Sequence, residues 1–131
     1  MSLSRRLLGR RSERKAARYL RRRGLRVLAR NVATRHGEVD LVCLDGDTLV
    51  FVEVRAVASA GGPEDALDAV TPGKARQVVR AARAWLDTRA GRRLLPRDVR
   101  FDVVAVDTRR RTVEHVEDAF RAPDEAGFFS G

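Results

Sequence analysis

The sequence predicts an α/β protein in which a mixed β-sheet is flanked by helices. Two segments carry apolar residues at helical spacing and five carry strand-like runs, in the order helix, three strands, helix, two strands. Strands that meet first as hairpins and then across a helix are typical of a mixed sheet. At 131 residues with 44% hydrophobic content, the chain has room for one domain, expected over 1–121, followed by a loosely held tail over 122–131.

The first helix is expected over residues 8–23. Ala16 and Leu20 belong to a narrow apolar stripe suited to packing, and Gly24 is a typical residue after a helix end. Glu13 lies one turn before Ala16, and it is the one acidic residue in an otherwise strongly basic segment.

Three strands should follow, over 25–31, 39–44 and 49–54. The second alternates with period two, and the third is rich in β-branched and aromatic residues. A turn is expected around 34–37. Residues 45–48 read Asp-Gly-Asp-Thr and supply hairpin-turn chemistry, because Gly and Asp tolerate the positive φ of tight connections.

The loop between the second and third strands decides which acidic side chains meet. A loop centred on 46–47, or one spanning 45–48, sets Asp40 directly opposite Glu53. A loop centred on 45–46 leaves the two one diagonal step apart, at roughly 7–8 Å between backbone positions. The two carboxylates share one face of the hairpin in every case.

Asp40 and Glu53 thus form an acidic pair, with Arg55 and Glu38 on the same face. Neighbouring carboxylates repel unless a cation or proton lies between them, and a hard divalent metal is the natural occupant. Ordinary solvated charges are the alternative. The apolar run over 50–52 argues against it, because it predicts a buried strand whose end, with Glu53 and Arg55, opens into a cleft.

The second half of the chain completes the sheet. A small, Gly-rich loop is expected over 58–63, next to the acidic pair. A Thr-Pro pair predicts the start of the second helix, over 72–86, whose apolar stripe includes the single tryptophan. A turn at 91–93 and strands over 100–106 and 112–116 should follow.

The charge distribution points to a polyanion as partner. The net charge is +9, and residues 1–35 hold 13 of the 27 basic residues but one acidic residue. Such a patch is the expected footprint of nucleic acid, whereas a membrane surface would call for an interfacial helix with a large apolar face. A merely solvated basic face is the alternative. The candidate nucleic-acid-binding residues are Arg10, Arg11, Arg14 and Arg18 of the first helix, and Lys74, Gln77 and Arg80 of the second.

The composition also bears on the compartment. Cys43 is the single cysteine, so an internal disulfide is excluded, and its mid-strand position predicts a small buried side chain. No apolar run approaches the roughly 20 residues needed to span a bilayer. The start lacks the pattern of a signal peptide. We therefore expect a cytoplasmic protein without a membrane partner.

Several spaced blocks resemble known families. An acid in the first helix, Asp in the second strand and Glu-x-cation in the third resemble the restriction-endonuclease-like nuclease superfamily, in particular the archaeal Holliday junction resolvases. At closer range the chain resembles the YraN-like bacterial family over roughly residues 9–120. The matching blocks are Glu13, Ala16, Tyr19-Leu20, Gly24, Asn31, Gly37-Glu38-x-Asp40-Leu41, Phe51-Val52-Glu53-Val54, Lys74 and Arg100-Phe101-Asp102.

The resemblance implies a restriction-endonuclease-like core and a metal-dependent nuclease. Asp40 and Glu53 would bind Mg²⁺ or Mn²⁺, with the carbonyl of Val54 as a further ligand and Glu13 as a third carboxylate, directly or through water. The substrate would be nucleic acid, with branched or structured DNA favoured. Resolvases pair to cut both strands, so the analogy also suggests a homodimer.

One position departs from the pattern. The nuclease motif has lysine where this chain has Arg55, and the further basic residue usual in the YraN-like family is Val57 here. A guanidinium stays charged at every accessible pH, so Arg55 cannot act as a general base, although it can stabilise charge on a phosphate. Two hypotheses follow: a nuclease that uses Asp40, Glu53 and Arg55, and a binding module that kept the fold but lost turnover.

Overall fold

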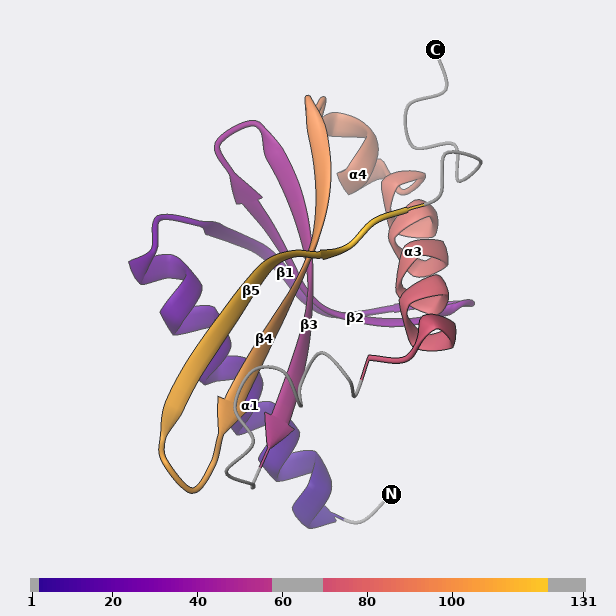
Figure 1. Cartoon of the computed structure of the whole chain (residues 1–131). Helices are drawn as coiled ribbons and strands as arrows, with labels where there is room; N and C mark the ends of the chain where they lie inside the picture. The colour runs from indigo at the N-terminus through magenta and orange to yellow at the C-terminus, as the bar shows by residue number, and fades with distance from the viewer. Residues whose placement is uncertain (1–2, 58–69, 123–131) are drawn as a thin grey trace.

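The protein is an α/β sandwich of helices on a five-stranded mixed sheet. The computed structural model describes residues 3–57 and 70–122, with side chains from residue 9 onward. Figure 1 shows the sheet with α1 and α3 lying along it. The elements are α1 (Leu3–Arg22), β1 (Arg26–Thr34), β2 (Gly37–Asp45), β3 (Thr48–Val57), α3 (Pro72–Leu86), α4 (Arg89–Arg93), β4 (Asp98–Asp107) and β5 (Thr112–Phe120). The expected mixed sheet flanked by helices is confirmed.

The strands follow one another across the sheet in sequence order, β1-β2-β3-β4-β5. Neighbours are antiparallel except β3 and β4, which run parallel from Thr48↔Asp98 to Val57↔Asp107. Parallel neighbours cannot be joined by a hairpin, because the chain must return to the same end of the sheet. The segment that carries α3 and α4 makes this return.

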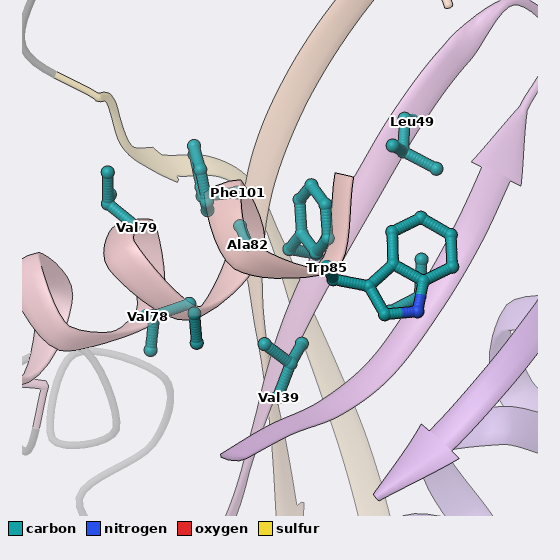
Figure 2. Close-up of a cluster of buried hydrophobic side chains, with 10 residues drawn as sticks. Val39, Leu49, Val78, Val79, Ala82, Trp85 and Phe101 are labelled. Carbon is teal, nitrogen blue, oxygen red and sulfur yellow. The ribbon is translucent and has the colours of Figure 1, made fainter. Parts of the chain in front are cut away.

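α3 packs on one face of the sheet through a largely aliphatic cluster that contains three aromatic rings. Phe51 lies between Phe101, at 5.7 Å between ring centroids, and Trp85, at 6.0 Å. Figure 2 shows Trp85, Ala82 and Val78 of α3 directed at the strands that carry Val39, Leu49 and Phe101. The expected apolar stripe of the second helix is therefore the side that builds this core.

α1 packs on the opposite face. Ala16, Ala17 and Leu20 are fully buried and contact a separate set of strand residues, among them Leu41 and Val52. The two helices thus enclose the sheet, and β3, which contributes to both clusters, lies between them.

Local chemistry fixes the ends of both helices. The hydroxyl of Thr71 accepts a hydrogen bond from the Lys74 backbone N–H at 3.1 Å and Pro72 follows, so α3 begins where its first N–H groups are satisfied. α1 ends at Arg22, and Gly24 takes a φ of 95° that costs glycine little. The backbone N–H of Leu25 then bonds the Leu20 carbonyl at 3.0 Å, closing the helix end.

The expected turn at 91–93 is wrong, because these residues belong to the short helix α4. Thr88 caps α4 by accepting a hydrogen bond from the Gly91 N–H at 3.2 Å. Gly91 is buried, and a Cβ there would collide with the backbone of Leu86. The Gly-Arg-Arg sequence looks like a turn locally, but the close approach to the end of α3 requires the glycine.

The strands are longer than the sequence pattern indicates. β1 continues to Thr34, β3 to Val57 and β5 to Phe120. The polar residues in these extensions belong to the strands because their backbones continue to pair with the neighbouring strands. Glu53 and Arg55 are consequently interior positions of β3. The expectation that they lie at the end of the strand is wrong.

No helix in the described parts of the chain is long and apolar enough to cross a membrane. The loop expected over 58–63 lies outside the described residues, as does residue 123 onward of the expected tail.

Candidate functional site

The candidate site forms where β2 leaves β3. Their antiparallel pairing runs from Asp45↔Thr48 to Leu41↔Val52, so the connecting loop is Gly46-Asp47, the first of the expected arrangements. Beyond this point the end of the β1–β2 hairpin turns toward α3, against which Val39 packs.

Asp40 occupies the point of separation. One residue beyond Leu41↔Val52, the register brings Asp40 to the position opposite Glu53. Its Oδ2 accepts a hydrogen bond from the Val54 backbone N–H at 2.7 Å. The side chain therefore satisfies a β3 backbone donor at the place where the β2 backbone has turned away.

The structure brings the two predicted carboxylates together. Glu53 is 4% exposed and lies opposite Asp40, close enough for the charge of Asp40 to act on it. Burial, followed by the charge of Asp40, raises the pKa of Glu53 to about 7. Burial also raises the pKa of Asp40, although its bond from Val54 N–H acts in the opposite direction.

Two cations face the same oxygen of Glu53. Arg55 Nη2 lies 3.3 Å from Glu53 Oε1, and Lys74 Nζ lies 3.7 Å from the same atom. Arg55 comes from β3 itself, two residues along, whereas Lys74 comes from the first turn of α3. Their side chains are 31% and 29% exposed, so the cations lie between the buried pair and solvent.

Glu13 approaches from α1 but lies outside this close group. Burial, followed by the nearby charge of Asp40, raises its pKa, whereas the Asn31 side chain acts in the opposite direction. Asn31 adopts a φ of 50° within β1, a left-handed conformation that Asn tolerates better than other non-glycine residues. In the described residues no three His, Cys, Asp or Glu side chains are placed to hold a metal together.

The carbonyl of Val54 faces the edge that β2 vacates. In a strand, the N–H and C=O of one residue point to the same side. Since the N–H of Val54 reaches Asp40, its carbonyl oxygen is directed toward that side as well. The backbone thus offers an oxygen beside the acidic pair, as the resemblance implied.

The predicted nucleic-acid-binding residues do not lie on one surface. Those of α1 and those of α3 belong to helices on opposite faces of the sheet. Gln77 is partly buried and lies over Gly37, where a Cβ would collide with its amide. Lys74 is engaged with Glu53. The exposed candidates are Arg10, Arg11, Arg14 and Arg18 on α1 and Arg80 on α3.

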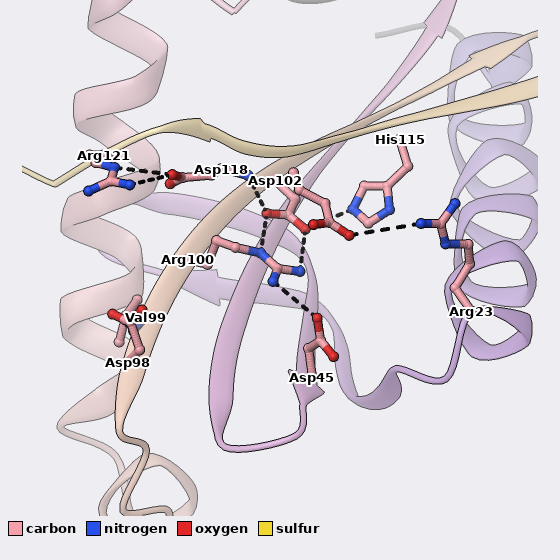
Figure 3. Close-up of polar contacts among 10 residues, drawn as sticks. Arg23, Asp45, Asp98, Val99, Arg100, Asp102, His115, Asp118 and Arg121 are labelled. Carbon is pink, nitrogen blue, oxygen red and sulfur yellow. Dashed lines mark hydrogen bonds and ion pairs between the residues drawn. The ribbon is translucent and has the colours of Figure 1, made fainter.

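A second buried polar cluster lies on the side of the sheet that α1 covers (Figure 3). Asp102 is fully buried; Arg100 donates to both of its oxygens at 2.9 and 3.0 Å, and His115 Nε2 lies 2.7 Å from Oδ2. The Asp118 backbone N–H adds a bond at 3.0 Å, and Arg100 also reaches Asp45. Burial opposes ionisation, but the bonds from His115, Arg100 and Asp118 hold the pKa of Asp102 below its usual value.

This cluster was not predicted from the sequence. In the sequence, Asp102 stands out only as part of a block that resembles the YraN-like family, and the spacing of residues does not indicate its contact with His115. The geometry of the cluster is closed, since Arg100 of β4 and two residues of β5, His115 and Asp118, converge on one carboxylate. It is suited to fixing these strands rather than to receiving a substrate.

The Cys43 thiol is fully buried, as predicted. Burial raises its pKa to about 12. The reactive thiolate is therefore suppressed.

Comparison with known proteins then decides the family. The sequence profile of the uncharacterised protein family UPF0102 matches residues 12–106. The chain belongs to the UPF0102 family. A UPF0102 protein from Anaeromyxobacter dehalogenans is 49% identical over 128 residues, covering 94% of this chain and 90% of that protein. One from Chlorobium chlorochromatii is 46% identical over 123 residues, covering 86% and 90%.

The family match agrees with the resemblance to the YraN-like proteins and extends over the candidate site. A third relative, the UPF0102 protein GSU0650 of Geobacter sulfurreducens, is 48% identical over 119 residues, covering 87% of this chain and 88% of that protein. The matched range of the UPF0102 profile includes the acidic pair, both cations and Asp102, whereas His115 lies beyond it.

Proposed function

We propose that this UPF0102 protein is a metal-dependent phosphodiesterase acting on nucleic acid, built on a restriction-endonuclease-like core. The observation that carries the proposal is the buried Asp40–Glu53 pair at the point where β2 leaves β3. Burying two adjacent carboxylates is unfavourable for folding, so such a pair points to a functional site in which their charge binds a cation. Cleavage of DNA, particularly branched or structured DNA, is the activity that the resemblance adds.

The donor set fits Mg²⁺ or Mn²⁺. These ions prefer oxygen ligands and are commonly held by one or two carboxylates together with water and substrate phosphate. Asp40, Glu53 and the Val54 carbonyl would hold the ion, and Glu13, whose pKa is raised in part by the charge of Asp40, would act through water. When bound, such an ion supplies a water of lowered pKa and neutralises charge on the phosphate.

The surrounding residues have definable roles in this reaction. The hydrogen bond from the Val54 N–H fixes Oδ2 of Asp40 and so orients the whole carboxylate, whose other oxygen does not take part in this bond. Arg55 and Lys74 supply positive charge within reach of an anionic group at the pair. The exposed arginines of α1 can hold a phosphate backbone without reading bases.

A second candidate is a nucleic-acid-binding module without turnover. The presence of Arg55, which cannot accept a proton from water, favours it, as does the engagement of Glu53 by two cations. Such a module would bind nucleic acid in a salt-dependent manner through its basic helices, with no requirement for a metal.

Cleavage assays with matched variants test the proposal. The protein is incubated with labelled four-way junction, flap and single-stranded DNA in Mg²⁺, Mn²⁺ or EDTA. Cleavage is expected with either metal and absent in EDTA. Asp40→Asn keeps an acceptor for Val54 N–H, and Glu53→Gln keeps the side-chain volume; each should lower the rate by at least about 100-fold, because even outer-shell partners of metals contribute up to about that much.

The control is Glu114→Gln, which makes the same chemical change at an exposed position of β5. It should cut at the parental rate. Equal cleavage by Asp40→Asn and the parent would remove the metal assignment. Salt-sensitive binding without cleavage under any condition would establish the binding module instead.

A further inference from the structure

Two cations from different elements converge on one carboxylate oxygen at the candidate site. Arg55 Nη2 and Lys74 Nζ lie 3.3 and 3.7 Å from Glu53 Oε1, and both charges also act on Asp40. With both carboxylates ionised, the four side chains sum to zero charge. The pair is therefore neutralised by the chain itself.

These ion pairs are loose compared with those of the buried carboxylate Asp102. Asp102 receives two guanidinium bonds at 2.9 and 3.0 Å from Arg100, whose side chain is 17% exposed. Glu53 has one longer contact from each cation, and each cation has about 30% of its side chain exposed. The Nε of Arg55 is buried without a hydrogen-bond partner. The first arrangement is suited to a permanent link and the second to exchange.

A divalent cation at the pair would change this balance. It would bring two positive charges next to Arg55 and Lys74, which would then be repelled rather than held. Both side chains are long and partly exposed, so they can turn outward without disturbing the core. An anionic backbone is the natural new partner, because guanidinium and ammonium groups both bind phosphate.

We propose that Arg55 and Lys74 are exchangeable counter-ions, which neutralise Asp40 and Glu53 in the metal-free protein and turn to the nucleic-acid phosphates when the carboxylates bind a divalent metal. This inference rests on the proposed function and adds a regulatory step to it. Metal and nucleic acid then strengthen each other's binding, and by linkage the effect is reciprocal.

The test separates metal binding from cleavage. Affinity for labelled junction DNA is measured by fluorescence anisotropy in EDTA and in Ca²⁺, a hard oxygen-binding ion, at matched ionic strength. Ca²⁺ affinity in the absence of DNA is measured by calorimetry. The parent should bind DNA at least about fivefold more tightly with Ca²⁺, the lower end of typical coupling between sites.

Removing either counter-ion should have two opposite effects. In Lys74→Gln and in Arg55→Gln, the gain in DNA affinity from Ca²⁺ should fall toward onefold, whereas Ca²⁺ affinity without DNA should rise because a competitor is lost. A side chain that merely binds phosphate or supports the fold would not raise metal affinity. Lys74→Arg keeps the charge and should keep the linkage.

The matched control is Arg76→Gln, which removes one exposed positive charge from the same helix. It should change DNA affinity equally with and without Ca²⁺ and leave Ca²⁺ affinity unaltered. The inference is overturned if both glutamine variants keep the full gain, or if their metal affinity stays the same or falls. Metal binding and cleavage that persist in that case would leave the proposed function intact, whereas a parent that binds no metal would overturn both.

Discussion

Replacing Glu53 by glutamine should flatten the dependence of stability on pH between 4.5 and about 7. The pKa of Glu53 rises from 4.5 to about 7 on folding, because the side chain is buried next to Asp40. The folded protein therefore keeps a proton that the unfolded chain releases. The contribution of Glu53 to stability is therefore highest at and below pH 4.5, declines as the pH rises through about 7, and is then level.

The size of the effect follows from the shift. At about 1.4 kcal/mol per pKa unit, a rise from 4.5 to about 7 corresponds to about 3 kcal/mol in the free energy of unfolding. That is a large part of the roughly 5–15 kcal/mol that stabilises a typical domain. Burial is the largest cause of the shift and the charge of Asp40 is the second, so Asp40→Asn should reduce the slope in the same window without removing it.

Urea unfolding in EDTA, followed by fluorescence, measures this difference. Trp85 is the only tryptophan and is 7% exposed in the α3 core, so its emission should report global unfolding. The parent, Glu53→Gln and the exposed control Glu114→Gln are compared across the window. The control should follow the parent, and Glu53→Gln should lose most of the slope. Parallel curves for the parent and Glu53→Gln would show that Glu53 is not forced to hold a proton, and would refute the reasoning.

Three further outcomes are expected. Asp102→Asn should destabilise the protein by up to about 3–5 kcal/mol in urea unfolding, because it removes the fully buried charge that pairs with Arg100 and His115 and leaves Arg100 with its ion pair to Asp45. Since the folded pKa of Asp102 is lowered, its contribution should be present above pH 3.8 and be lost at lower pH. Gly37→Ala should cost more than Gly46→Ala: both glycines have positive φ, but only Gly37 lies under Gln77, and an equal loss of stability would contradict this contact. The Cys43 thiol should react with iodoacetamide far more slowly in the native protein than in urea, and equal rates would contradict its burial.

The sequence predicts the element order and the meeting of Asp40 with Glu53 for one physical reason. Side chains alternate along a strand, so Asp40 and Glu53 share a face of the hairpin with each of the expected loops. The observed loop at Gly46-Asp47 then selected the closest arrangement. The start of α3 and the end of α1 were equally predictable, because Thr71, Pro72 and Gly24 act through local backbone chemistry, whereas α1 begins at Leu3 and not at the expected residue 8.

The contacts that sequence reasoning missed depend on tertiary packing. Lys74 reaches Glu53 only because α3 returns over the face of β3 on which Glu53 lies. Asp102 meets His115 across a β4–β5 pairing whose register shifts between Phe101 and Val103, which conceals the contact from simple alternation. Asp118 directs its backbone N–H toward the Asp102 carboxylate because its φ is 53°, a conformation that the residue pattern does not predict.

The hydrogen bond from the Val54 N–H gives Asp40 a structural role that does not depend on a substrate. Losing that acceptor would strand a backbone donor at a cost of about 1–3 kcal/mol, so selection for folding alone suffices to retain the residue. Glu53 differs from Asp40. Its burial lowers the stability of the metal-free protein at neutral pH, and an uncharged glutamine at this position should be less destabilising. Of the two acids, Glu53 is therefore the stronger indication of chemistry, because its ion pairs with Arg55 and Lys74 do not offset the cost of burying its charge.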